Sequence, residues 1–251
     1  MSFIGRMIGG AVELSFGGPL GALLDRVGHH IILHHGPGPG PADINPRQPV
    51  AFTIAAIALG AKMARADGAV TRDEVAAFHD VFEVPPGEED HVRLVFDLAR
   101  KSTHGFDSYA RQVRRLFASD PVVLEHMLDG LFHIALADGR LCDAEDAYLR
   151  EVARLFGFDA AAYARIRAHH VEPAETAGEN AYAILGVDPG APLSDIRIAY
   201  HRLVRETHPD LVVAKGLPPE CVALANARIA RINAAYDSLA KRGSTRAAAY
   251  G

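Results

Sequence analysis

Cysteine is scarce and tryptophan is absent in this chain of 251 residues. The two cysteines, Cys142 and Cys221, stand far apart without CxxC spacing, so they suit neither a disulfide framework nor a four-cysteine zinc site. This scarcity fits a reduced, cytoplasmic setting. The sequence also lacks HExxH, a glycine-rich phosphate loop, GxSxG and a Cys/His nucleophile pattern. We therefore expect a protein that is not an enzyme and that needs no cofactor.

A surplus of positive charge is also missing. The formal net charge is −5, which argues against a general nucleic-acid binder, and we expect no nucleic acid among the partners. Residues before 178 carry 17 Lys and Arg against 24 Asp and Glu, whereas residues 178–243 carry 8 against 7. The C-terminal part is thus electrostatically distinct from the rest of the chain.

Long hydrophobic runs are few, and the run that approaches membrane length extends from Met7 to Leu24. It contains one charge, Glu13, as well as five glycines and Pro19, and lies at the short end of what spans a bilayer. No A-x-A cleavage site follows, which argues against a secretory signal peptide. Two interpretations of residues 1–35 stay open: a buried or self-associating helix, or a segment that contacts the membrane.

Proline and glycine divide the remaining chain. Residues 36–49 read GPGPGPADINPRQP and are predicted to be a linker. From residue 50 to 170 apolar residues recur at helical spacing and no alternating strand pattern appears, so the predicted fold class is all-α. A second linker at 171–179 leads into residues 180–243, and residues 244–251 form a tail. The helices expected in the second half of the 50–170 region cover residues 109–118, 122–137, 145–156 and 160–168.

Two segments of the helical region repeat each other, ARADGAVTRDE at 64–74 and IALADGRLCDAE at 134–145. Both contain Ala-Asp-Gly, an apolar residue two positions after the glycine and a Glu seven positions after the Asp, which indicates a duplicated helix-turn-helix unit. We interpret each as a tight corner between two helices. In it, Gly68 and Gly139 supply the left-handed residue, Val70 and Leu141 turn inward, and the next helix is capped by Thr71 with Glu74 or by Asp143 with Asp146.

The acidic residues of the two corners have a second interpretation, in which they gather a divalent cation. They lack the D-x-D-x-D-G spacing of a calcium loop, so the structural interpretation is preferred. His30 and His34 have a spacing that binds zinc on a helix, but no carboxylate or cysteine stands nearby, and His169 with His170 is a similar case. The candidate metal ligands of the corners are Asp67, Asp73, Glu74, Asp138, Asp143 and Glu145.

The corner sequence ADGxVxxxE, with Leu141 in place of the Val in the second copy, carries a resemblance to a known family. Its appearance twice within an all-α region of about 120 residues resembles the TerB-like domain, which is linked to tellurite resistance. The resemblance implies a helical bundle, and metal binding is reported for some members.

The C-terminal region begins with a short helix that Asn180 can cap and Gly186 can end, with Tyr182 and Leu185 on its inward side. The next helix is predicted to start near Pro192 and to run to Thr207. Its apolar face and its basic face follow from the 3.6-residue period. The inward set is Ile196, Tyr200, Leu203 and Thr207, and the basic set is Arg197, His201 and Arg205 at i, i+4 spacing, with Arg202 beside them.

The basic helix is predicted to stop at His208, because Pro209 disfavours helical dihedrals at the residue before it. His208 and Asp210 are then held in a loop at the end of the basic face. Pro218 and Pro219 restart a helix over residues 220–240, which gives a helical hairpin with an exposed tip. Its predicted packing seam is Val222, Ala225, Ile229, Ile232, Tyr236 and Leu239.

Four motifs in this order resemble a complete J-domain. They are Y-x-x-LGV at Tyr182, I-R-x-AY-x-x-L at Ile196, the tripeptide His208-Pro209-Asp210, and I-N-x-AY-x-x-L at Ile232. The extended loop VAKGLPPE resembles the DjlA type, in which a Gly-rich N-terminal membrane segment, a TerB-like domain and a C-terminal J-domain follow one another. The resemblance thus covers nearly the whole chain.

The resemblance implies a co-chaperone of a DnaK-type ATPase, in the cytoplasm and tethered to the inner membrane if the N-terminal segment inserts. In that family the basic helix docks on an acidic surface of the ATPase, and the His-Pro-Asp loop stimulates ATP hydrolysis. The resemblance implies docking by Arg197, His201, Arg202 and Arg205, and stimulation by His208, Pro209 and Asp210. No client protein is indicated.

Two departures from the J-domain pattern bear on this expectation. Ile198 stands where many J-domains have a second basic residue, and the chain has neither a Gly/Phe-rich region nor CxxCxGxG repeats. The alternative hypothesis is a TerB-based stress adaptor, whose J-like hairpin docks a partner without activating it. Exposure of His208, Asp210 and the basic face favours the co-chaperone, whereas coverage of these residues by the TerB-like region favours the adaptor.

Overall fold

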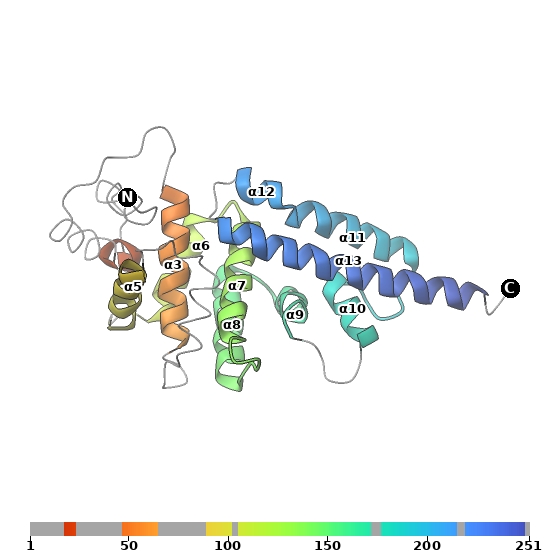
Figure 1. The fold of residues 1–251 in the computed structure, drawn as a ribbon, viewed down its shortest axis with the longest axis horizontal. Coiled ribbons are helices and arrows are strands. Elements are labelled where there is room, and N and C mark those ends of the chain that lie inside the picture. The colour runs from red at the N-terminus through yellow and green to blue at the C-terminus, as the bar shows by residue number, and fades with distance from the viewer. Residues whose placement is uncertain are drawn as a thin grey trace.

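The computed structural model of the protein describes residues 18–23, 47–64, 89–101, 105–171, 177–214 and 219–248 (Figure 1). Every regular element in these ranges is helical, as the all-α prediction requires. Residues 18–23 form a short helical stretch. The longer helices are α3 (Arg47–Met63), α5 (Glu89–Lys101), α6 (Phe106–Leu116), α7 (Pro121–Ala135), α8 (Asp143–Phe156), α9 (Ala160–Ala168), α10 (Ala177–Leu185), α11 (Leu193–Thr207), α12 (Pro209–Ala214) and α13 (Pro219–Ala248).

Helix α3 is the central element of the N-terminal bundle. Residues 51–64 are all buried, because α3 is rich in alanine, isoleucine and other apolar residues around its whole circumference. It packs against α5, α6 and α7, and the Tyr148 hydroxyl on α8 donates to the carbonyl oxygen of Leu59 at 2.8 Å. Phe52 and Phe117 meet edge to face in the same core, at 6.4 Å between ring centroids.

Part of the glycine-rich N-terminal run belongs to this bundle. Leu20 and Leu23 are buried in the same core, and the Leu20 N–H donates to Oε1 of the buried Gln112 at 3.0 Å. Residues 18–23 thus match the buried-helix interpretation, and the rest of the run lies outside the described residues. None of the helices in the described ranges has the length and hydropathy needed to cross a membrane.

The second Ala-Asp-Gly corner has the predicted backbone but a different cap. Gly139 has the expected left-handed conformation with φ +84°, and Leu141 packs partly buried against the core. The capping box is formed by Cys142 and Glu145, one residue before the predicted pair, so the prediction of Asp143 with Asp146 is wrong. The Glu145 carboxylate reaches back to the Cys142 N–H at 2.9 Å, because the helix starts one residue earlier than expected. The first corner lies outside the described residues.

The C-terminal hairpin has a core of its own. Helices α11 and α13 pack against each other and against α10, around eight buried side chains: Ala181, Ile184, Leu185, Ile196, Leu203, Ile232, Ala235 and Leu239. The predicted cap of α10 at Asn180 is wrong, since the helix begins three residues earlier, at Ala177. Helix α13 extends beyond the predicted end near Ala240, because no proline follows to stop it.

Candidate partner-docking site

Helix α11 places the candidate docking residues by burying its opposite face. Ile196, Leu203 and Thr207 are buried as predicted, whereas Tyr200 is half-buried. The Tyr200 ring stacks on Tyr236 of α13 with 4.3 Å between centroids, and its hydroxyl donates to Oδ1 of Asn233 at 3.1 Å. These contacts fix the rotation of α11 about its axis and therefore the direction of its outer face.

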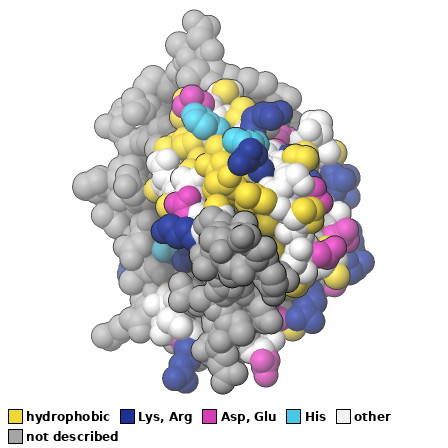
Figure 2. Space-filling model, turned by 90° about the vertical axis from the view of Figure 1, so that its right-hand side faces the viewer, with side chains coloured by type: hydrophobic (Ala, Val, Ile, Leu, Met, Phe, Trp, Pro, Cys, Tyr) yellow, Lys and Arg dark blue, Asp and Glu magenta, His cyan; other side chains and the backbone are white. Residues whose placement is uncertain are grey.

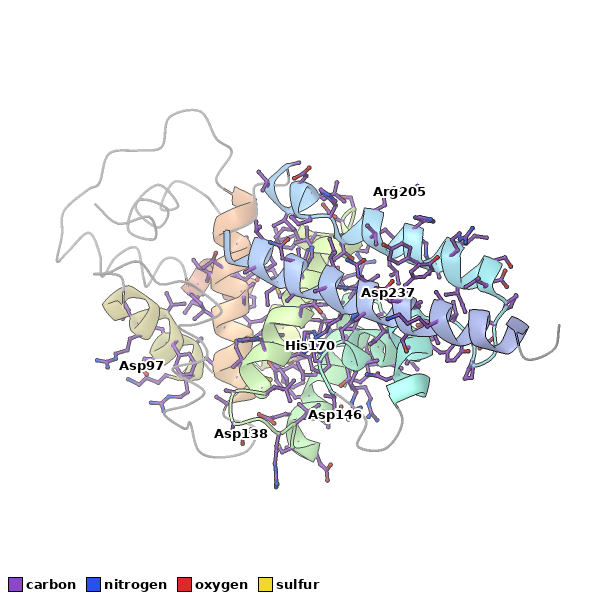
Figure 3. All side chains as sticks on the ribbon, turned by 45° about the vertical axis from the view of Figure 1, so that its right-hand side comes forward. Asp97, Asp138, Asp146, His170, Arg205 and Asp237 are labelled. Atoms are coloured by element: carbon purple, nitrogen blue, oxygen red, sulfur yellow. The ribbon has the colours of Figure 1, made fainter. Side chains whose placement is uncertain are left out.

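The outer face of α11 is basic and open. All four predicted docking residues, Arg197, His201, Arg202 and Arg205, are exposed. Ile198 lies among them and is 69% exposed. Figure 3 labels Arg205 on the outer side of the hairpin. Seen from the C-terminal end of α13, hydrophobic side chains gather beside histidine and basic side chains (Figure 2).

The helix ends at the predicted residue. His208 has φ −58° and ψ 132°, the extended conformation that a following proline favours. The residues after it do not form a loop, as the sequence predicted, but the first turn of the short helix α12. The reason is that the fixed φ of Pro209 suits the first position of a helix, where its missing N–H is not needed.

The His-Pro-Asp segment presents two polar side chains to solvent. The side chains of His208 and Asp210 are 51% and 89% exposed, and Pro209 is half-buried. The Asp210 N–H donates to Nδ1 of His208 at 3.2 Å, and a carboxylate oxygen of Asp210 lies 3.5 Å from the same nitrogen. The segment begins three residues after Arg205, so the basic face of α11 extends to the His-Pro-Asp segment at the end of the helix.

Helix α12 joins the His-Pro-Asp segment to the bundle. Val212 is buried in the bundle's hydrophobic cluster, whereas its neighbour Val213 is 65% exposed. One side of α12 therefore faces the interior, and the His-Pro-Asp segment stands at its N-terminal end.

The candidate metal ligands are not brought together where the structure describes them. In the described ranges, no three His, Cys, Asp or Glu side chains are close enough to hold a metal ion. Asp138 accepts from the Arg140 N–H at 2.9 Å, and Glu145 is used in the capping box. The candidates Asp67, Asp73, Glu74, His30 and His34 lie outside the described residues.

A buried ionic cluster between the hairpin and the bundle was missed by the sequence analysis. Arg228 of α13 is 5% exposed and donates to Oδ2 of Asp129 on α7 at 2.9 Å and to Oε1 of Glu125. Arg165 of α9 pairs with the same Glu125 oxygen at 2.7 Å, and His170 Nε2 lies 2.8 Å from Oδ1 of Asp129. Figure 3 labels His170, whose side chain is 16% exposed. We call these five residues the Arg228 cluster.

The electrostatics of the cluster favour the charged carboxylates. Burial by itself would raise the pKa of Asp129, but the Arg228 guanidinium and the hydrogen bond with His170 hold that pKa well below its usual range. The neighbouring His169 is buried as well, and burial with the positive charge of Arg228 lowers its pKa to about 2. His169 therefore stays neutral. The described residues bring no third ligand to His169 and His170, so they form no metal site there.

A signal for Arg228 was present in the sequence. The buried stripe of α13 runs through Cys221, Ala225, Arg228, Ile232, Ala235 and Leu239 at alternating spacings of four and three. The predicted packing seam contained Val222, Ile229 and Tyr236, which are half-buried. The buried residues at these places are their predecessors in the chain, Cys221, Arg228 and Ala235. Arg228 lies on the inward face by this spacing, and opposite charges at Glu125 and Asp129 could have indicated its partners.

Comparison with known proteins matches the two halves of this architecture. Residues 53–168 match the family described as tellurite resistance protein TerB, and residues 180–248 match the DnaJ domain. A co-chaperone protein DjlA from Coxiella burnetii is 25% identical over 96% of this chain and 98% of its own length. The chain has the domain order of these proteins, a TerB domain followed by a DnaJ domain, and is similar to them over nearly its whole length. A DjlA protein from Photobacterium profundum is 28% identical over 96% of both chains.

Other DjlA relatives match shorter stretches. A DjlA protein from Haemophilus influenzae is 47% identical over 62 residues, which is 25% of this chain and 22% of that relative. No solved structure matches the chain significantly. The DnaJ-domain match thus covers most of α10 and all of α11 to α13, which we call the J-domain, and the TerB match covers most of α3 and α5 to α9.

Proposed function

We propose that this protein is a J-domain co-chaperone that stimulates ATP hydrolysis by a DnaK-type chaperone through its His-Pro-Asp segment. The observation that carries the proposal is the joint exposure of His208, Asp210 and the basic face of α11. The DnaJ-domain match and the full-length similarity to co-chaperone proteins support it. In this proposal the chain regulates the ATPase of its partner and hydrolyses no ATP itself.

The two parts of the site have different roles in this proposal. Arg197, His201, Arg202 and Arg205 form the docking face, whose positive charge attracts an acidic surface of the partner and orients the encounter. Asp210 offers an exposed carboxylate that accepts hydrogen bonds from donors of the partner, and His208 offers the free side of its ring. Pro209 holds the two side chains at the junction of α11 and α12.

The place of action follows from the partner. A DnaK-type ATPase needs ATP, so we propose that the J-domain works in the cytoplasm. Membrane contact and self-association through residues 1–35 remain proposals, in which Leu20 and Leu23 have no part because both side chains are buried in the bundle core.

The alternative function is an adaptor whose hairpin binds a partner without activating it. It requires the bundle to cover the His-Pro-Asp segment or the basic face. Among the described residues both surfaces are exposed, which favours the co-chaperone.

The test is single-turnover ATP hydrolysis by a DnaK-type chaperone with the protein added. The variants Asp210→Asn and His208→Gln are compared with the unmodified chain. We expect stimulation by the unmodified chain and its loss in both variants. Absence of stimulation by the unmodified chain, or stimulation that survives both substitutions, would contradict the proposal and favour the adaptor.

A further inference from the structure

Helix α13 belongs to two hydrophobic cores. Near its N-terminus, Cys221 and Ala225 are buried in the core of the TerB-like bundle, whereas Ile232 and Leu239 are buried in the core of the hairpin. Arg228 lies between the two groups, where α13 passes from one core to the other. Helix α13 of the J-domain is thus shared with the neighbouring domain over its first turns.

The Arg228 cluster joins the two domains by charge as well. Arg228 comes from the J-domain, whereas Glu125, Asp129 and Arg165 come from the TerB-like bundle, and His170 follows directly after it. Two carboxylates meet two guanidinium groups here, so the charges balance when the histidines are neutral. A buried Arg that lost these partners would leave uncompensated charge on both sides of the interface.

The same interface fixes the segment that follows His-Pro-Asp. Helix α12 packs against α13, and its Val212 is buried in the cluster that contains Cys221 and Ala225. The bundle therefore supports the C-terminal side of the His-Pro-Asp segment, whereas the hairpin core supports the N-terminal side through Leu203. The basic face of α11 has no part in this interface, because its four residues are exposed.

We propose that the TerB-like bundle positions the His-Pro-Asp segment for stimulation of the partner ATPase, with Arg228 and Asp129 as the positioning residues that hold α13 and α12 on the bundle. This inference rests on the co-chaperone function proposed above. It separates two properties of the site: docking depends on the exposed face of α11, and the extent of stimulation depends on the contact with the bundle. Neither Arg228 nor Asp129 contacts the partner.

The test measures ATPase stimulation as a function of co-chaperone concentration, with the full chain. Arg228→Met and Asp129→Asn are expected to lower the maximal stimulation about fivefold or more, because a mobile segment is rarely in the productive geometry. The concentration that gives half-maximal stimulation should stay within about twofold, because the docking face is unchanged. Arg228→Lys should retain part of the maximum, since lysine keeps the charge but cannot bind both carboxylates as a fork.

Two variants serve as matched controls. Asp146→Asn removes an ionic centre that binds Arg167, Arg150 and Tyr163 within α8 and α9, so it weakens the bundle without touching α13. Arg231→Met makes the same substitution as Arg228→Met at an exposed position three residues further along α13. Both should retain the maximal stimulation.

Thermal unfolding of the same proteins gives a second measurement. The unmodified chain should unfold in one transition, and Arg228→Met should separate the J-domain transition from that of the bundle. If Arg228→Met does not fold, Asp129→Asn and Arg228→Lys carry the comparison. Unchanged maxima in these variants, or an equal fall in Asp146→Asn, would overturn the inference while leaving the co-chaperone function standing. If the unmodified chain does not stimulate the ATPase at all, the proposed co-chaperone function fails. A single thermal unfolding transition in every folded variant would separately overturn the coupling of the two domains.

Discussion

The backbone N–H of Asp210 donates to Nδ1 of His208 at 3.2 Å, so the histidine ring closes the first turn of α12. An imidazole nitrogen that accepts a hydrogen bond carries no proton, so the ring is held with Nε2 as the donor when it is neutral. The His208 ring is therefore oriented by the protein before any partner binds, whereas the Asp210 carboxylate is open to solvent.

Asp210→Asn should abolish ATPase stimulation and leave the stability of the fold nearly unchanged. The side chain is 89% exposed, so the substitution should change the unfolding free energy by no more than about 0.5 kcal/mol, whereas ATPase stimulation should be lost. Chemical denaturation beside the ATPase assay checks both. A large loss of stability would mean that the carboxylate supports the fold rather than the partner contact.

Removing charge from the docking face should weaken docking without lowering the maximum. The double substitution Arg202→Ala and Arg205→Ala should raise the half-maximal concentration about fivefold or more at low salt, and the difference should shrink as salt screens the attraction. Titrations at two ionic strengths measure this. Arg154→Ala, an exposed arginine paired with Glu151 on α8, is the control that should leave both parameters unchanged.

Acid should destabilise the protein through His169. Burial and Arg228 lower the pKa of this residue to about 2, whereas in the unfolded chain it takes up a proton near pH 6.5. The unfolded state therefore binds more protons below pH 6.5, and stability falls by up to about 1.4 kcal/mol per pH unit from this group. Denaturation at pH 7, 6 and 5 should show a smaller decline for His169→Leu, and equal slopes would contradict the prediction.

The placement of the N-terminal segment can be tested at Leu20. Leu20→Ala should cost about 3 kcal/mol of unfolding free energy, because the side chain is buried in the bundle core. The same substitution at Leu193, which is 41% exposed, should cost much less. Equal effects in urea denaturation would indicate that residues 18–23 do not pack into the bundle.

Local sequence patterns were sufficient for several parts of the site. The 3.6-residue period placed Ile196 and Leu203 inward and the four basic residues outward, and Pro209 predicted the extended conformation of His208. These features depend on neighbours within one or two turns, which the sequence contains in full. The helical turn after Pro209 was missed because the proline favours both a helix stop before it and a helix start at its own position.

The cap of α8 shows how a local prediction fails by one residue. Cysteine is not a usual cap, so the sequence favoured Asp143 over Cys142. Glu145 decides which residue caps the helix, because its carboxylate accepts a hydrogen bond from the Cys142 N–H. Glu145 is itself buried, with 6% of its surface exposed. Burial of that carboxylate depends on the packing around α8, which local propensity does not include.

By itself the sequence determined the all-α class, the basic face of α11 and the polar tripeptide at its end, because these follow from periodicity and from the dihedral limits of proline. The tertiary structure alone decided that Arg228 is buried and that the bundle supports α12. Glu125 and Asp129 stand 103 and 99 residues from Arg228 in the chain, and only the packing of α7 against α13 brings their charges together. A buried arginine is stable where such partners surround it, and no local pattern contains that condition.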